Sequence, residues 1–143
     1  MDYTSLSKEF LQIVYRFHKI RPQKQLSKAM RGEAFALQFI AQHENTVVPS
    51  DIENTMGISS ARIAIVLNGL EDKGLIIRQI DPSDRRRTLL KLTPAGEEQA
   101  AKDAEQLLAL ATGMLEYLGE NDAKEYVRIM SRLADKCDSE MEK

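Results

Sequence analysis

Apolar residues near the N-terminus recur every three or four positions, which is the spacing of an amphipathic helix. This pattern runs from Ser5 to Lys19, and Pro22 follows soon after it as a helix-terminating residue. A second helical pattern runs from Arg31 to Gln42, before a polar turn at residues 43–45. The β-branched residues at 46–48 then predict a short strand. The apolar positions expected to face a core are Leu6, Phe10, Ile13, Val14, Phe17, Phe35, Leu37, Ile40 and Ala41.

Residues 50–73 have the pattern of two short helices joined by a tight turn. Pro49 suits the first position of a helix, and Ser50 with Glu53 has the spacing of a capping box. Gly57 suits the left-handed conformation that ends this helix, and Ser59 is suited to cap the next one. The second helix has one apolar stripe, formed by Ile63, Val66, Leu67 and Leu70. The layout is typical of a helix-turn-helix, whose second helix enters the major groove of DNA.

Two extended runs, Leu75–Ile80 and Thr88–Leu92, predict a β-hairpin joined by residues 81–87. Thr93 and Pro94 predict the start of a long helix, which Gly119 interrupts before a last helix begins near residue 120. The apolar faces of these two helices consist of Ala100, Ala104, Leu107, Leu108, Ala111, Leu115 and Leu118, and of Ala123, Tyr126, Val127, Met130, Leu133, Ala134 and Cys137.

The outward face of the second helix of the pair is the candidate reader of DNA bases. Arg62 can bind guanine or phosphate, Asn68 can reach a base or phosphate, and Ala64 and Ile65 can touch thymine methyl groups. Ser60 is expected to anchor the DNA backbone. The same stripe also fits a helix that only packs inside a domain, so the helix pair alone leaves both interpretations open. The outward residues are Ser60, Ala61, Arg62, Ala64, Ile65 and Asn68.

Charge is distributed unevenly along the chain, whose net charge is −2. Residues 97–143 contain 12 acidic and 6 basic residues, whereas residues 1–96 contain 10 acidic and 14 basic ones. The end of the predicted hairpin carries Arg85, Arg86 and Arg87 in a row. Like charges in a row repel one another unless an anion meets them, and the narrow minor groove of DNA concentrates negative potential. The pattern favours arginine insertion into that groove, with a solvated charged turn as the alternative.

Three consecutive segments carry a family resemblance: residues 70–78 (LEDKGLIIR), 81–87 (DPSDRRR) and 90–96 (LKLTPAG). In order and spacing they resemble the MarR-type winged-helix regulators, and the resemblance covers nearly the whole chain. It implies a homodimer that binds pseudo-palindromic operators through a recognition helix at residues 59–72, with Ser59 at its start. It also implies that Arg86 contacts the minor groove, while Asp84 and Arg85 brace the wing. Asp81 is the second carboxylate expected to support the wing.

The chain departs from this family at several positions. Glu53 stands where the family usually has a small Ala, while Ala64, Ile65 and Gly69 replace residues that are commonly polar or basic. The predicted base-reading surface is therefore unusually apolar. We expect fewer hydrogen bonds to bases and a preference for A·T-rich operators, in which thymine methyl groups are plentiful.

The expected fold is mainly α (α+β), a winged helix-turn-helix flanked by terminal dimerisation helices. We expect one domain over residues 1–143, with a DNA-binding lobe at 30–96 and a helical dimerisation region at 1–20 and 97–143. The terminal apolar faces exceed what one small winged helix can cover, so a second copy of the chain is the expected cover, with packing inside one chain as the alternative. The residues expected to form the dimer are Leu6, Phe10, Phe17, Leu115, Leu118, Tyr126, Met130 and Leu133.

Several functional classes lack their sequence signatures. The single Cys137 cannot form an intrachain disulfide, and with only two histidines the ligand spacing of a zinc site is missing. There is no phosphate-binding loop, nucleophile elbow or catalytic cluster, so we expect no enzyme and no cofactor. No apolar run is long enough to span a membrane, and the N-terminus lacks a secretory signal, so we expect a cytoplasmic protein.

Two further expectations concern partners. The family resemblance implies that a small-molecule effector binds between the dimer helices and the DNA-binding lobe, where aromatic residues such as Tyr15, Phe17, Phe35 and Phe39 are candidates. Core packing is the alternative for each of them. The alternative to DNA binding is a winged helix that makes only protein contacts, with the basic wing gripping an acidic partner.

Overall fold

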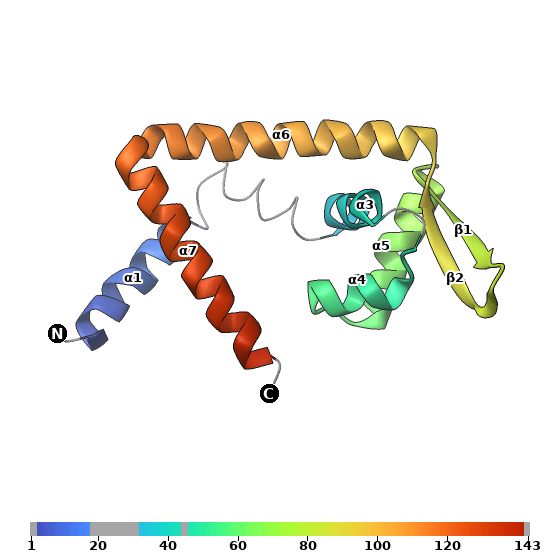
Figure 1. The fold of residues 1–143 in the computed structure, drawn as a ribbon, viewed down its shortest axis with the longest axis horizontal. Coiled ribbons are helices and arrows are strands. Elements are labelled where there is room, and N and C mark those ends of the chain that lie inside the picture. Colours follow the sequence, from blue (N-terminus) through green and yellow to red (C-terminus); the bar gives the residue numbers. More distant parts are fainter. Residues whose placement is uncertain (1–2, 18–31, 44–45, 142–143) are drawn as a thin grey trace. The chain divides into compact units, whose positions relative to one another are not determined.

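The computed structural model describes residues 3–17, 32–43 and 46–141 of the 143-residue chain. The fold class is the predicted one, mainly helical with one antiparallel two-stranded sheet. The predicted helix ends at Lys19 and Arg31 lie outside the described residues. In chain order the elements are α1 (Tyr3–Phe17), α3 (Glu33–Gln42), α4 (Pro49–Met56), α5 (Ser60–Asp72), β1 (Ile76–Asp81), β2 (Asp84–Leu92), α6 (Pro94–Leu118) and α7 (Glu120–Met141) (Figure 1).

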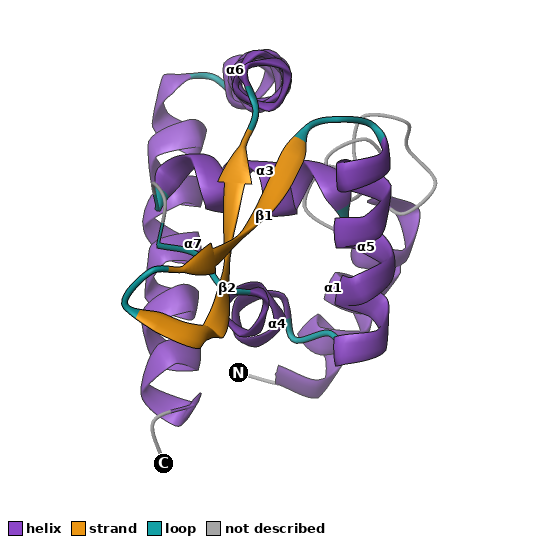
Figure 2. Ribbon diagram, turned by 90° about the vertical axis from the view of Figure 1, so that its right-hand side faces the viewer, coloured by secondary structure: helices purple, strands orange, loops and turns teal. Residues whose placement is uncertain are grey.

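The chain divides into two compact units, Met1–Leu107 and Leu108–Lys143. In the first unit, α3, α4, α5 and the hairpin of β1 and β2 surround one apolar core (Figure 2). All four stripe residues of α5 are buried as predicted, whereas in α3 the buried residues are Ala36, Leu37 and Ile40. Phe35 and Ala41, which we expected in the core, are only half-buried. The core residues with at most 2% exposure and the largest volumes are Leu37, Ile40, Ile52, Ile63, Leu67, Leu70, Ile76 and Leu90.

The turn between α4 and α5 is built as the sequence indicates. Gly57 has φ 64°, a left-handed conformation that favours glycine, and its N–H donates to the carbonyl of Glu53. Ser59 caps α5, since its Oγ accepts a hydrogen bond from the Arg62 N–H at 3.2 Å.

The start of α4 confirms the predicted place of Pro49 in the first turn but differs from the prediction in its cap. Pro49 occupies the first turn, so the residue before it, Val48, is the cap. Asp51 accepts a hydrogen bond from the Val48 N–H at 3.0 Å, which is the return half of a capping box. The predicted pairing of Ser50 with Glu53 is therefore wrong, because the helix begins two residues earlier than that pairing requires.

The hairpin is longer and tighter than predicted. Ile76 pairs with Leu92 and Ile80 with Thr88, but the next pair is Asp81 with Asp84. Only Pro82 and Ser83 form the turn, and the expected long loop at 81–87 is wrong. Residues 85–87 are extra residues on β2 at a shift in register, which is a bulge. The predicted strand at 46–48 is reduced to one bridge, in which the Leu90 N–H donates to the Val47 carbonyl at 2.8 Å.

A tight seam joins the start of α6 to the segment between α5 and β1. Thr93 Oγ1 accepts from the Gly96 N–H at 3.0 Å and donates to the Gly74 carbonyl at 2.6 Å. The Thr93 N–H donates to the Leu75 carbonyl at 3.1 Å. Gly96 is buried against that same carbonyl, where a Cβ would clash with backbone atoms. The predicted cap at Thr93 and Pro94 is thus confirmed, and the seam explains why glycine stands two residues later.

The terminal helices are largely exposed in the single chain. Apart from the half-buried Val14, the described residues of α1 are exposed. Gly119, with φ 80°, separates α6 from α7, and over residues 120–140 of α7 all but Ala123 are exposed. Among the described helices, none is both long and apolar enough to cross a membrane.

Candidate nucleic-acid interface

The outward face of α5 matches the prediction residue by residue. Ser60, Ala61, Arg62, Ala64, Ile65 and Asn68 are all exposed, opposite the buried stripe. Ile65 is 72% exposed, although it is a large apolar residue in the middle of a helix. An exposed apolar side chain on an otherwise small and polar face is suited to contact with thymine methyl groups.

Gly69 belongs to a different surface from the one we expected. It is half-buried, and the Glu33 carboxylate of α3 occupies the space that a Cβ at residue 69 would need. Lys73 Nζ binds the same carboxylate at 2.5 Å. Gly69 therefore permits close contact between α3 and α5, and its assignment to the base-reading surface is wrong.

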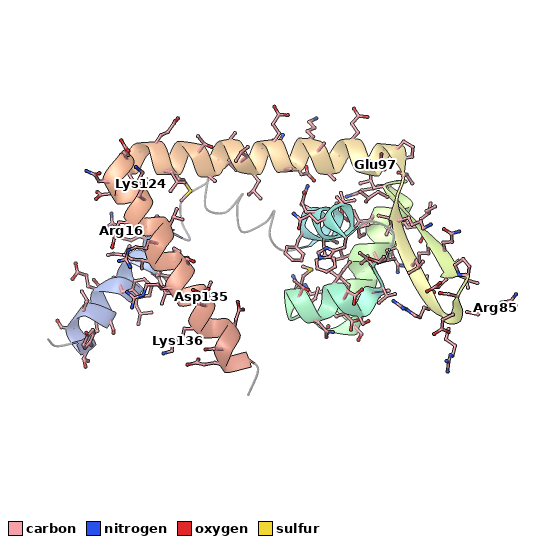
Figure 3. All side chains as sticks on the ribbon, in the orientation of Figure 1. Arg16, Arg85, Glu97, Lys124, Asp135 and Lys136 are labelled. Carbon is pink, nitrogen blue, oxygen red and sulfur yellow. The ribbon has the colours of Figure 1, made fainter. Side chains whose placement is uncertain are left out.

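The three consecutive arginines form the bulge of β2 and not a loop. All three are exposed, and Figure 3 shows the Arg85 side chain pointing away from the end of the hairpin. Asp84 Oδ1 accepts from the Arg86 N–H at 3.1 Å and from Arg86 Nε at 3.3 Å. The Arg86 side chain is nevertheless 92% exposed. The bulge therefore exposes three neighbouring guanidinium groups. Asp84 binds the backbone N–H and the Nε of Arg86 and so restrains one of these side chains.

Asp81 fixes the turn from inside. Its side chain is buried, and Oδ1 accepts from the Ser83 hydroxyl at 2.7 Å and from the Ser83 N–H at 2.9 Å. Both hydrogen bonds favour the ionised carboxylate and hold the pKa of Asp81 below its ordinary value, with a further contribution from the charge of Arg87. Asp81 and Asp84 thus contact the turn and the bulge respectively, as expected of residues that support a wing.

A pair of contacts that the sequence did not indicate connects the helix to the hairpin. Arg78 of β1 donates from Nη2 to Asn68 Oδ1 at 2.7 Å, and its Nε lies 3.0 Å from Glu71 Oε2. Asn68 and Glu71 are one helical turn apart on α5. Sequence reasoning missed this link, because Arg78 and Asn68 lie in different elements and no local pattern pairs them.

The residues expected to form a dimer lie on exposed or half-exposed apolar faces. In the single chain Phe10 is 61% exposed and Leu133 is 54% exposed. Leu115 is half-buried, and the remaining residues of the set, Leu6, Phe17, Leu118, Tyr126 and Met130, are exposed.

The structure also contains a cavity of about 410 Å³ beside α3, the end of β2 and the first turns of α6. Gln38, Leu92, Glu97 and Ala100 are among its lining residues, and Figure 3 labels Glu97 on α6. The aromatic residues suggested as effector contacts do not line this cavity. Phe35 and Phe39 instead stack on each other, and Phe39 stacks on His43.

Comparison with known proteins supports the geometric interpretation. Residues 28–87 match the MarR family. The chain is 29% identical to the uncharacterized HTH-type transcriptional regulator YwhA of Bacillus subtilis (strain 168), over 80% of this chain and 86% of that one. It is 26% identical to the HTH-type transcriptional repressor MdtR of the same organism, over 87% of this chain and 82% of the relative.

Two other relatives match this chain over only part of their own length. One solved structure matches over nearly the whole of both chains. The chain spans 56% of the B. subtilis regulator YdgJ and 39% of a putative regulatory protein for the hcr operon of Thauera aromatica. Streptococcus pneumoniae FabT in complex with DNA is similar with a TM-score of 0.72 and 17% identity, over 96% of this chain and 99% of that chain. At that identity the likeness establishes the winged-helix fold.

Proposed function

We propose that the chain is a MarR-type winged helix-turn-helix transcriptional regulator that binds pseudo-palindromic DNA operators as a homodimer; the family match over residues 28–87 and the winged-helix fold support this. The observation that carries the proposal is the pairing of two surfaces in one compact unit. These are the exposed face of α5 and the arginine bulge of β2, on a hairpin whose first strand Arg78 ties to α5. We further propose that the protein acts as a repressor, because a bound dimer covers the DNA that it recognises. We also propose that it is cytoplasmic.

The two surfaces suit adjacent grooves of a duplex. The major groove is about 12 Å wide and admits a helix, so Arg62, Ile65 and Asn68 reach base edges while Ser60 binds the backbone. An arginine from the bulge enters the neighbouring minor groove, where the negative potential is strongest if that groove is narrow. Because Ala64 and Ile65 present only apolar atoms, the preferred operators are rich in A·T pairs.

The test of this proposal is operator selection from random duplexes with the purified protein, followed by binding measurements over a range of salt concentrations. We expect a twofold-symmetric, A·T-rich site and a steep loss of affinity with salt, since each phosphate contact releases counterions. Arg86→Ala is expected to flatten the slope of log K against log salt by roughly one unit. Selection of G·C-rich sites would contradict the base preference.

The protein-contact alternative predicts a different result in the same experiment. A winged helix that binds only an acidic protein gives no enriched DNA site and no steep salt dependence. Lys91→Ala is a matched control for Arg86→Ala, because it removes one positive charge from β2 outside the bulge. If Arg86→Ala and Lys91→Ala change the slope of log K against log salt equally, the attraction is nonspecific. That result would count against insertion of a bulge arginine into the minor groove.

We propose that the exposed apolar faces of the terminal helices are the homodimer interface. Burying a large apolar side chain contributes roughly 1.5–3 kcal/mol of favourable free energy. In the single chain these side chains stay exposed, so this free energy is gained only when a second copy covers them. Two recognition helices then lie about 34–36 Å apart, one turn of DNA. Sedimentation equilibrium tests this: Leu133→Glu is expected to yield monomers, whereas Arg132→Glu, a charged neighbour on α7, is the control. A monomeric wild-type protein at micromolar concentration would refute the dimer.

We also propose the cavity beside α3 and α6 as the effector site. Among the described residues that line it, Glu97 alone is charged, so a neutral or cationic small molecule fits better than an anion. Release of DNA in fluorescence anisotropy, measured with neutral, cationic and anionic compounds, tests this. A cationic compound is expected to lose potency against Glu97→Gln, and release by anions alone would contradict the assignment.

A further inference from the structure

We infer that Arg78 is a specificity-determining residue that fixes the side-chain amide of Asn68, so that Asn68 contacts DNA chiefly through its hydrogen-bond donor, Nδ2. This inference rests on the proposed DNA-binding function. Arg78 itself is a positioning residue, since in this account it acts on the bases through Asn68.

The contacts define the orientation of the Asn68 amide. Arg78 Nη2 lies 2.7 Å from Asn68 Oδ1, and a guanidinium group has only donors, so the amide edge that faces it must be the carbonyl oxygen. Arg78 is held in turn by Glu71, whose Oε2 lies 3.0 Å from Nε. The guanidinium is therefore anchored at one nitrogen and directs another toward Asn68.

This orientation changes which base edges the Asn68 amide can recognise. Free asparagine binds adenine with both edges, as it accepts from N6 and donates to N7. Here the Asn68 carbonyl oxygen already accepts from a charged guanidinium, which fixes its direction and weakens it as a second acceptor, so Nδ2 is the stronger contact that the amide offers to DNA. The base that Asn68 contacts should then present an acceptor, such as guanine O6 or N7 or thymine O4, with no special preference for adenine.

The simpler interpretation is that Arg78 only ties β1 to α5 as a surface ion pair. Its side chain is 37% exposed and that of Glu71 is 48% exposed, so this pair alone contributes little stability. The two interpretations differ in base preference: a tie affects overall affinity, whereas a fixed amide affects the choice of base at one position.

The experiment is operator selection with the wild-type chain, Asn68→Ala, Arg78→Met and the double variant. Asn68→Ala identifies the base position that Asn68 reads. At that position we expect Arg78→Met to gain adenine preference by about 5-fold or more, because the freed amide can bind with both edges. The double variant should lose this gain. Lys91→Met is the charge control, and it should lower affinity without changing the preference.

Asn68→Asp provides a second variant with a side chain of nearly the same size. The new carboxylate can form an ion pair with Arg78, so we expect this variant to fold. With one oxygen held by Arg78, the other replaces the amine, and the preference should move to a base that presents a donor, such as cytosine N4. An unchanged preference in Arg78→Met or Asn68→Asp would overturn the inference, even if the wild-type site remains enriched. Absence of any enriched site for the wild-type chain would instead refute the proposed function, and this inference with it.

Discussion

Gly96 and Gly113 lie in the same helix, and the same substitution should affect stability in opposite directions at the two positions. Gly96 packs against the Leu75 carbonyl, whereas a Cβ at Gly113 would have nothing within 4 Å. Glycine inside a helix is less favourable than alanine by roughly 0.5–1 kcal/mol. Gly113→Ala should therefore stabilise the protein by about that amount.

At Gly96 the same gain is outweighed. A Cβ there would overlap backbone atoms of Leu75, which cannot move aside as a flexible side chain can. Forced overpacking costs typically 1–3 kcal/mol. Displacing Leu75 also weakens the hydrogen bond between its carbonyl and the Thr93 N–H, at about 0.5–1.5 kcal/mol. After subtracting the helix gain, Gly96→Ala should destabilise the protein by about 0.5–4 kcal/mol.

Urea unfolding followed by circular dichroism measures both effects, with wild type and variants at one protein concentration because the proposed dimerisation would shift the apparent stability. The expected result is a lower unfolding midpoint for Gly96→Ala and a higher one for Gly113→Ala. Equal shifts in the same direction would refute the role given to the seam between α6 and Leu75.

Three further perturbations test other parts of the fold. Leu67→Ala, at a residue 1% exposed in the core, should lower the free energy of unfolding by about 2–5 kcal/mol in the same urea assay. Thr93→Ala removes the cap of α6 and should cost about 1 kcal/mol, whereas Thr88→Ala, on the exposed part of β2, should cost less. The pKa of Asp81 is lowered by its hydrogen bonds from Ser83, so its contribution is present above about pH 4 and is lost as the pH falls through the lowered value. Thermal melts from pH 6 downward should therefore show a smaller decline for Asp81→Asn than for the wild type; equal declines would contradict the role of Asp81.

Helix α5 and the turn before it could be predicted from the sequence, because several local signals agree there. The apolar stripe of α5, the glycine at its preceding turn and the cap at Ser59 all indicate the same helix, and each is confirmed. The outward face follows from the stripe, since a helix of known register has a known opposite side.

The errors concern details that depend on tertiary contacts. Hairpin register is set by pairing along the whole strand, so the three-residue bulge at 85–87 was hidden in what looked like a loop. Gly69 was assigned to the wrong surface because only the packed structure brings Glu33 of α3 against it. The link from Arg78 to Asn68 joins residues ten apart in different elements, and no local pattern encodes that distance.

Hydroxyl-radical footprinting on the selected operator tests the central claim most directly. Two subunits that each place α5 in a major groove and an arginine bulge in the adjacent minor groove predict two protected half-sites centred about 10 base pairs apart. Minor-groove protection should flank them and disappear when Arg85, Arg86 and Arg87 are all replaced by alanine. A single protected segment, or flanking protection that survives this replacement, would contradict the account.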